Sequence, residues 1–165
     1  MEIPGAYYRN IEYLGEKVCQ LLTKLAELDP SGENAMQMGP IDSPHWRFRF
    51  AGEDFFLTTF SSAYKEDSSR QTFGVRRAFL LFQPRASFGR FGLTEDTPAS
   101  ATNWDNPTTM RDKARVAFKK NGCPYHIPEE LPYPVAEHVV KAENDDGYNV
   151  VRWWLPRQTT TSKTT

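Results

Sequence analysis

The feature that most constrains the fold is a stretch of alternating aromatic and cationic residues, followed by a turn and a second aromatic stretch. Residues 46–50 read Trp, Arg, Phe, Arg, Phe, which is the period-two pattern of a half-buried strand. Residues 51–54 indicate a tight turn, and residues 55–60 return as a second strand. The pattern predicts a hairpin in which Arg47 and Arg49 share one face and the neighbouring rings share the other.

Two helices are predicted on either side of this hairpin. Residues 10–28 carry apolar side chains at intervals of three or four, which gives one apolar stripe, and Pro30 ends the helix. A second helix is expected over residues 107–121, where Asp105 or Asn106 can cap the first turn.

The remaining segments complete a single α+β domain. Residues 75–83 are expected to form a strand buried on both faces, 135–141 a short helix and 148–155 a last strand. We expect one domain over residues 1–156, with a mixed, mainly antiparallel sheet of about four or five strands and helices on one side. The polar segment 157–165 is predicted to be a disordered tail.

Composition and charge narrow the function classes. The formal net charge is −1 and the pI is near 6.3, so no global field favours nucleic acid or an anionic membrane. There is no apolar run of about 18 residues and no signal-peptide pattern at the start, which predicts a cytoplasmic protein without membrane association. Cys19 and Cys123 are too few and too far apart for a disulfide scaffold, so two reduced thiols are expected.

The most suggestive local motif is Cys123-Pro124-Tyr125-His126. Thiolate and imidazole are both common axial ligands of heme iron, and the proline leaves the sulfur accessible. The alternative is a proline-rich loop in which Cys123 packs as a small apolar side chain and His126 bonds to backbone. Both interpretations of these residues stay open from the sequence.

Arginines are the second group of candidate functional residues. A guanidinium group suits bidentate binding of carboxylates or phosphates. Arg47 and Arg49 are interpreted, by a small margin, as solvent-facing strand residues. Gln83 and Arg85 lie where the strand over 75–83 ends, and strand ends are rigid supports for ligand-binding groups.

Several segments, in order, make the chain resemble the YqcI/YcgG family, whose characterised members include heme-dependent N-hydroxylases. The resemblance rests on the following residues: Phe48-Arg49-Phe50-Ala51-Gly52-Glu53-Asp54-Phe55-Phe56, then Ser69-Arg70, then Leu80-Leu81-Phe82-Gln83-Pro84-Arg85 and Phe88, then Met110-Arg111-Asp112-Lys113-Ala114-Arg115, with Pro124-Tyr125-His126 and Trp153-Trp154-Leu155-Pro156 as a looser pattern. Family members usually carry a further N-terminal region and a His-x-Pro element before the first strand. The chain lacks both, which predicts a shortened member matching the C-terminal half.

The resemblance implies a heme-binding oxygenase-type protein that N-hydroxylates a guanidine or amine substrate with an electron donor. His126 or Cys123 would bind the iron, and Arg70 and Arg85 would lie near the propionates or an amino-acid substrate. Its motifs also place Gln83 and Phe48 among the cofactor-binding residues. The alternative is a shortened, non-catalytic relative that binds a small molecule or a protein and forms a homodimer over uncovered apolar surface.

Overall fold

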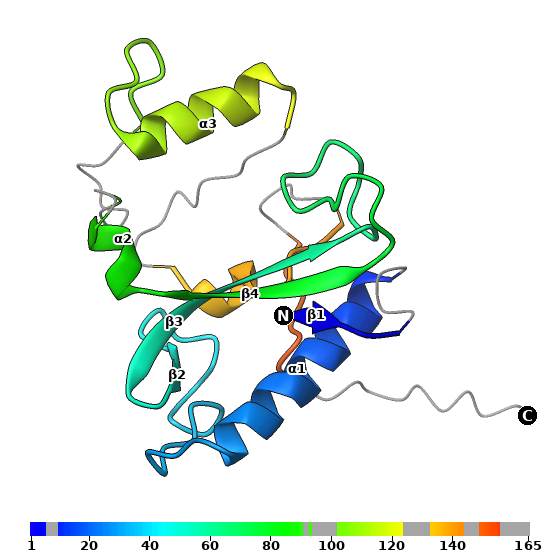
Figure 1. Cartoon of the computed structure of the whole chain (residues 1–165), viewed down its shortest axis with the longest axis vertical. Helices are drawn as coiled ribbons and strands as arrows, with labels where there is room; N and C mark the ends of the chain where they lie inside the picture. Colours follow the sequence, from blue (N-terminus) through cyan, green and yellow to red (C-terminus); the bar gives the residue numbers. More distant parts are fainter. Residues whose placement is uncertain (6–9, 91–92, 94–101, 124–132, 144–148, 156–165) are drawn as a thin grey trace, which may run out of the picture.

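The computed structural model describes residues 1–5, 10–90, 93, 102–123, 133–143 and 149–155. Its centre is a four-stranded antiparallel sheet in the order β1-β4-β3-β2 (Figure 1). The strands are β1 (Glu2–Ile3), β2 (Phe48–Phe50), β3 (Glu53–Ser61) and β4 (Ala78–Pro84). The expected α+β class and mainly antiparallel sheet are confirmed.

Helix α1 (Ile11–Glu27) confirms the first predicted helix. The Asn10 side chain caps it by accepting hydrogen bonds from the N–H groups of Glu12 and Tyr13, at 2.8 and 3.2 Å. Its apolar stripe packs on one face of the sheet and forms the core with strand residues and with Trp46 and Trp153. The stripe residues Leu14, Val18 and Leu22 are fully buried.

The predicted hairpin is β2 and β3, joined by Ala51 and Gly52. Both turn residues have positive φ, 51° and 78°, as the tightest hairpin turns require. The resulting register pairs Phe48 with Phe55 and Arg49 with Asp54. Arg49 is therefore on the face opposite the core, as the alternation predicted.

The prediction that the third strand is buried on both faces was wrong. In β4, Ala78 and Leu80 are fully buried against the core, whereas Leu81 is 43% exposed. The strand thus has one core face and one partly exposed face, because α1 covers only one side of the sheet. We call the other side the second face. Its residues, from the strand register, are Arg49, Asp54, Phe56, Thr58, Phe60, Phe79, Leu81 and Gln83.

The last predicted strand was also wrong. Segment 149–155 makes a single bridge, between Val150 and Lys141, and then turns so that Trp153 enters the core. The Trp153 indole donates to the carbonyl of Ala136 at 2.8 Å. Burial of this large ring against α1 holds the segment there, and the edge of β3 next to it is taken by Val139, whose carbonyl accepts from Thr59 N–H at 3.1 Å.

Three short helices complete the structure: α2 (Ala86–Arg90), α3 (Met110–Lys120) and the 3₁₀ helix η2 (Val135–His138). The helix predicted over 107–121 is α3, but its cap is Thr109, which forms a capping box with Asp112. This reciprocal pairing satisfies the N–H groups of Thr109 and Asp112. Figure 1 shows α3 standing apart from the sheet.

The predicted tail lies outside the described residues. No helix in the described part of the chain is long and apolar enough to cross a membrane.

Candidate functional site

Arginine side chains gather at the end of the second face where β2, β3 and β4 meet. The register places Phe56 beside Gln83 and Asp54 beside Arg49. If the register is extended by one residue beyond the strand ends, it aligns two neighbouring rows of residues across the sheet. One row is Arg47, Phe56 and Gln83, and the other is Arg49, Asp54 and Arg85. The backbone supports the second row, because Arg85 N–H donates to the Asp54 carbonyl at 2.8 Å. We call Arg47, Arg49 and Arg85 the arginine cluster.

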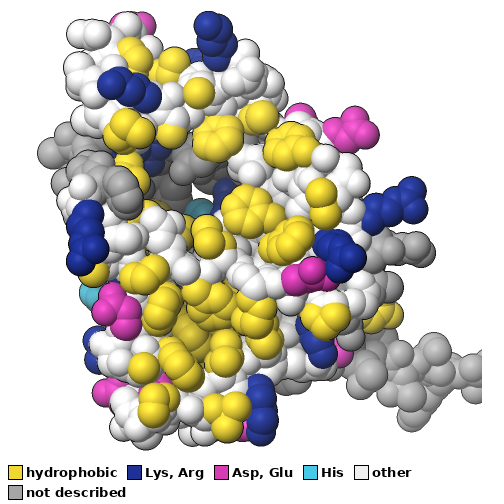
Figure 2. All heavy atoms as spheres, in the orientation of Figure 1, with side chains coloured by type: hydrophobic (Ala, Val, Ile, Leu, Met, Phe, Trp, Pro, Cys, Tyr) yellow, Lys and Arg dark blue, Asp and Glu magenta, His cyan; other side chains and the backbone are white. Residues whose placement is uncertain are grey.

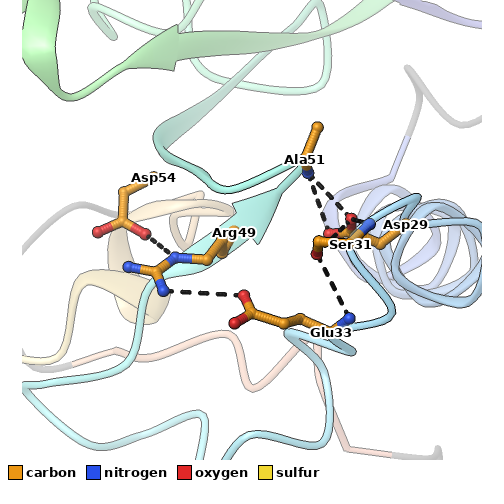
Figure 3. Close-up of polar contacts among 6 residues, drawn as sticks. All are labelled: Asp29, Ser31, Glu33, Arg49, Ala51 and Asp54. Atoms are coloured by element: carbon orange, nitrogen blue, oxygen red, sulfur yellow. Dashed lines mark hydrogen bonds and ion pairs between the residues drawn. The ribbon is translucent and has the colours of Figure 1, made fainter.

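Arg49 is held in place by two carboxylates (Figure 3). Its Nε lies 2.8 Å from Asp54 Oδ1, and its Nη1 lies 3.7 Å from Glu33 Oε2. The pKa of Arg49 is raised above its ordinary value, first by the hydrogen bond and charge of Asp54 and then by Glu33. Because the three side chains are between 31% and 40% exposed, these ion pairs serve mainly to orient Arg49.

The hairpin that carries two of the arginines is anchored by Asp29, just after α1 (Figure 3). Its carboxylate accepts from Ser31 N–H and Oγ–H, at 2.8 and 2.7 Å, and from Ala51 N–H, at 3.0 and 3.1 Å. Burial alone would raise the pKa of Asp29, but these hydrogen bonds lower it below its ordinary value. The turn is therefore tied to the end of α1, which fixes the position of the cluster.

Arg85 differs from an ordinary surface arginine. Its side chain is half-buried, and its pKa is lowered, first by burial and then by the nearby positive charge of Arg47. Asp54 and Tyr133 act in the opposite direction. Two guanidinium groups so close to each other create a local positive potential that favours an anion.

Aromatic rings border the cluster on two sides. Phe56 makes an edge-to-face contact with Phe88 of α2, with ring centroids 5.5 Å apart. Tyr133 makes a similar contact with His138, with centroids 4.7 Å apart. In Figure 2 the surface is hollowed between α3 and the sheet, with histidine and basic side chains at the wall of the hollow. Cations beside flat apolar groups suit a ligand with a negative group on an apolar body.

Arg70, predicted to contact a ligand, lies at the edge of β3. Its guanidinium donates to the carbonyls of Thr59 at 3.2 Å and His138 at 2.8 Å. It therefore ties η2 to the sheet and supports the Tyr133–His138 wall.

Of the other predicted site residues that the structure describes, Gln83 lies with the cluster, whereas Phe48 and Cys123 do not. Gln83 lies in the same row as Arg47 and donates to Ser87 Oγ at 3.2 Å. Phe48 is 1% exposed and packs inside the core, on the opposite face. Cys123 is a half-buried free thiol directly after α3, and His126 lies outside the described residues.

Among the residues that the structure describes, no three His, Cys, Asp or Glu side chains gather closely enough to hold a metal ion.

The sequence interpretation did not place Arg47, Arg49, Tyr133 or His138 in the site. Arg47 was interpreted as solvent-facing because the alternation of β2 shows a face but not what the neighbouring strands place on it. Tyr133 precedes η2 after a long proline-rich stretch, and no local pattern indicates which strand such a segment reaches.

The fold and the site define a small α+β domain with an arginine cluster at one end of the second face of an antiparallel sheet. The model of the YqcI/YcgG family matches residues 6–115, and the chain belongs to that family. The resemblance is thus confirmed, although the matched range begins before α1 and ends before Cys123 and His126. No curated protein and no solved structure gives a significant match.

Proposed function

We propose that this chain is a heme-binding, oxygenase-type member of the YqcI/YcgG family that N-hydroxylates a guanidine or amine substrate. Membership of the family supports the class of chemistry. The arginine cluster is the structural observation that supports a ligand site, because guanidinium groups beside aromatic rings suit a flat ligand that carries a carboxylate.

Part of a heme site fits the described residues. Arg47 and Arg85 offer cations to one propionate carboxylate, and Phe56 with Phe88 offers apolar contact to a ring. Cys123 offers a half-buried thiol that could bind iron as thiolate. His126, the other candidate ligand, lies outside the described residues, so the choice between thiolate and imidazole rests on the sequence.

Bound heme would supply dioxygen chemistry, and an electron donor would supply the reducing equivalents. The residues of this chain would bind and orient. Arg47 and Arg85 would hold a carboxylate of cofactor or substrate, and Phe56 and Phe88 would exclude water from one side. Arg70 would act indirectly, through the η2 segment that it ties to β3.

A hemin titration of the purified protein, followed by absorption spectroscopy, tests the proposal. We expect a saturable Soret band, and a ferrous–CO spectrum that changes in Cys123→Ser or in His126→Ala and so identifies the ligand. Arg85→Gln should weaken hemin binding, whereas Arg76→Gln, at an exposed position, should not. A protein without a saturable band would contradict heme binding, and wild-type spectra in both ligand variants would contradict the ligand assignment.

A second candidate function is a non-catalytic binding or interaction module that forms a homodimer. It is favoured by exposed apolar side chains on and before β4, namely Phe73 at 75%, Val75 at 46% and Leu81 at 43%. Sedimentation velocity at micromolar concentration should show a dimer that Leu81→Lys dissociates. Leu28→Lys, at an exposed leucine after α1, is the matched control. A wild-type protein that is strictly monomeric would contradict this candidate.

A further inference from the structure

We propose that the arginine cluster recognises the carboxylate of a small aromatic monocarboxylate, without help from a metal or prosthetic group. The proposal rests on the site of the proposed function and names its ligand class. Its test uses heme-free protein, so that a failure of heme binding and a failure of carboxylate recognition are distinguishable.

The two cations that would hold the carboxylate come from different strands. Arg47 precedes β2 and Arg85 follows β4, with β3 between them. Strand spacings place their Cα atoms about 12 Å apart along a diagonal of the sheet. Arginine side chains are long enough for both guanidinium groups to reach one small ligand group across that distance. Arg47 Nη1 donates to the carbonyls of Pro44 and Trp46, at 2.7 and 2.6 Å, which fixes one end of its guanidinium. A pre-oriented guanidinium loses less side-chain entropy when a ligand binds.

One carboxylate fits this place better than two. Asp54 lies in the row between Arg49 and Arg85, and its negative charge acts to raise the pKa of both arginines. Its own negative charge therefore opposes a second carboxylate, or a phosphate dianion, at the same position. A single carboxylate beside Arg47 and Arg85 would interact with both guanidinium groups, while Asp54 stays paired with Arg49.

The rings beside the cations indicate the rest of the ligand. Phe56 lies in the row between Arg47 and Gln83 and packs against Phe88. Tyr133 is close enough to contribute to the pKa of Arg85, and its ring contacts His138. A flat apolar body next to the carboxylate can contact these rings by stacked or edge-to-face packing.

The test is a titration of heme-free protein with benzoate, benzamide and phthalate, followed by calorimetry or by NMR shift changes. Benzoate should bind saturably, and the neutral benzamide should bind about tenfold more weakly, because it lacks the charge-assisted hydrogen bonds. Arg85→Gln and Arg47→Gln should each weaken benzoate by a similar factor. Arg76→Gln should leave its affinity unchanged.

Asp54→Asn is expected to strengthen binding, a result that a variant with a damaged structure could not give. Because the change removes the opposing charge, it should tighten binding of the dianionic phthalate by several-fold, more than binding of benzoate. Equal affinities for benzoate and benzamide would overturn the proposal, as would Arg85→Gln behaving like Arg76→Gln. A thermal melt of each variant shows that the loss variants are folded.

Discussion

A buried hydrogen-bond chain beneath the site gives a prediction that can be worked through in full. Thr59 in β3 and Tyr64 after it are 0% and 3% exposed. Thr59 Oγ1 donates to the Val139 carbonyl at 2.6 Å, so it accepts from the Tyr64 hydroxyl, 2.9 Å away. The Tyr64 oxygen in turn accepts from Lys141 N–H at 3.2 Å. These three hydrogen bonds fix segment 139–141, directly after η2, against the sheet.

The expected magnitudes follow from which groups lose a partner. Thr59→Val keeps the side-chain shape and removes the Oγ1 that accepts from the Tyr64 hydroxyl, while the Val139 carbonyl still accepts from the N–H of residue 59. We expect a loss of about 1–3 kcal/mol in the free energy of unfolding, the usual cost of one unsatisfied buried donor. Tyr64→Phe leaves Lys141 N–H without this acceptor and should cost about 1–2 kcal/mol. In the double variant Tyr64→Phe removes the hydroxyl that lost its acceptor in Thr59→Val, whereas Lys141 N–H still lacks this acceptor. The combined loss should therefore be smaller than the sum by about 1–2 kcal/mol.

Urea unfolding followed by tryptophan fluorescence measures all four free energies of this cycle, since the chain has four tryptophans. The control is Thr108→Val, the same change at an exposed position before α3, which should shift stability by at most about 0.5 kcal/mol. If the losses of unfolding free energy in the two single variants add up to that of the double variant within about 0.5 kcal/mol, the two hydroxyls are not coupled. The assignment of Tyr64 as donor to Thr59 would then be wrong.

Three further predictions concern the elements that position the hairpin. Ala51→Gly should stabilise the protein by up to about 1 kcal/mol in urea unfolding, because Ala51 has a φ of 51° that glycine adopts without strain; an unchanged midpoint would count against strain there. Gly15→Leu should cost about 1–3 kcal/mol and shift tryptophan emission to the red, because even a Cβ at Gly15 would lie 3.1 Å from Trp153 Cβ; wild-type emission would refute the contact. The lowered pKa of Asp29 means that its carboxylate stabilises the fold above an unfolded pKa of about 4 and that this stability is lost as the pH falls through the folded pKa. The stability difference between wild type and Asp29→Asn should therefore be largest near neutral pH and shrink in acid, and a difference independent of pH would contradict this role.

Local signals in the sequence were sufficient for the elements that stabilise themselves. The stripe of α1 and the alternation of β2 predicted the helix and the hairpin, because each pattern matches the period of its own structure. The turn at Ala51 and Gly52 was predicted from a local sequence pattern as well. These predictions needed no knowledge of what packs against each element.

Predictions failed where the partner of a segment is distant in the chain. Strand β1 pairs with β4 across more than seventy residues, from Ile3 to Ala78, and two residues carry no pattern of their own. Segment 149–155 has the composition of a strand, yet Trp153 turns into the core beside Gly15. In both cases tertiary packing decides the conformation, and β propensity describes only a preference for a half-buried surface.

The same reasoning explains why the site was only partly visible in the sequence. Arg85 was predicted as a ligand-binding residue from its place at a strand end, whereas Arg47 was interpreted as solvent-facing from its place on the exposed side of a hairpin. Both conclusions used one strand at a time. The charge of Arg47 lowers the pKa of Arg85 only because β3 brings β2 and β4 into one sheet in a single register. A slip of one residue between β3 and β4 would place Pro84, not Gln83, beside Phe56, and would move Arg85 away from Asp54. The buried side chains of β3 and β4 oppose such a slip, since it would turn Leu80 out of the core. The register that packs the core is therefore the same one that assembles the arginine cluster.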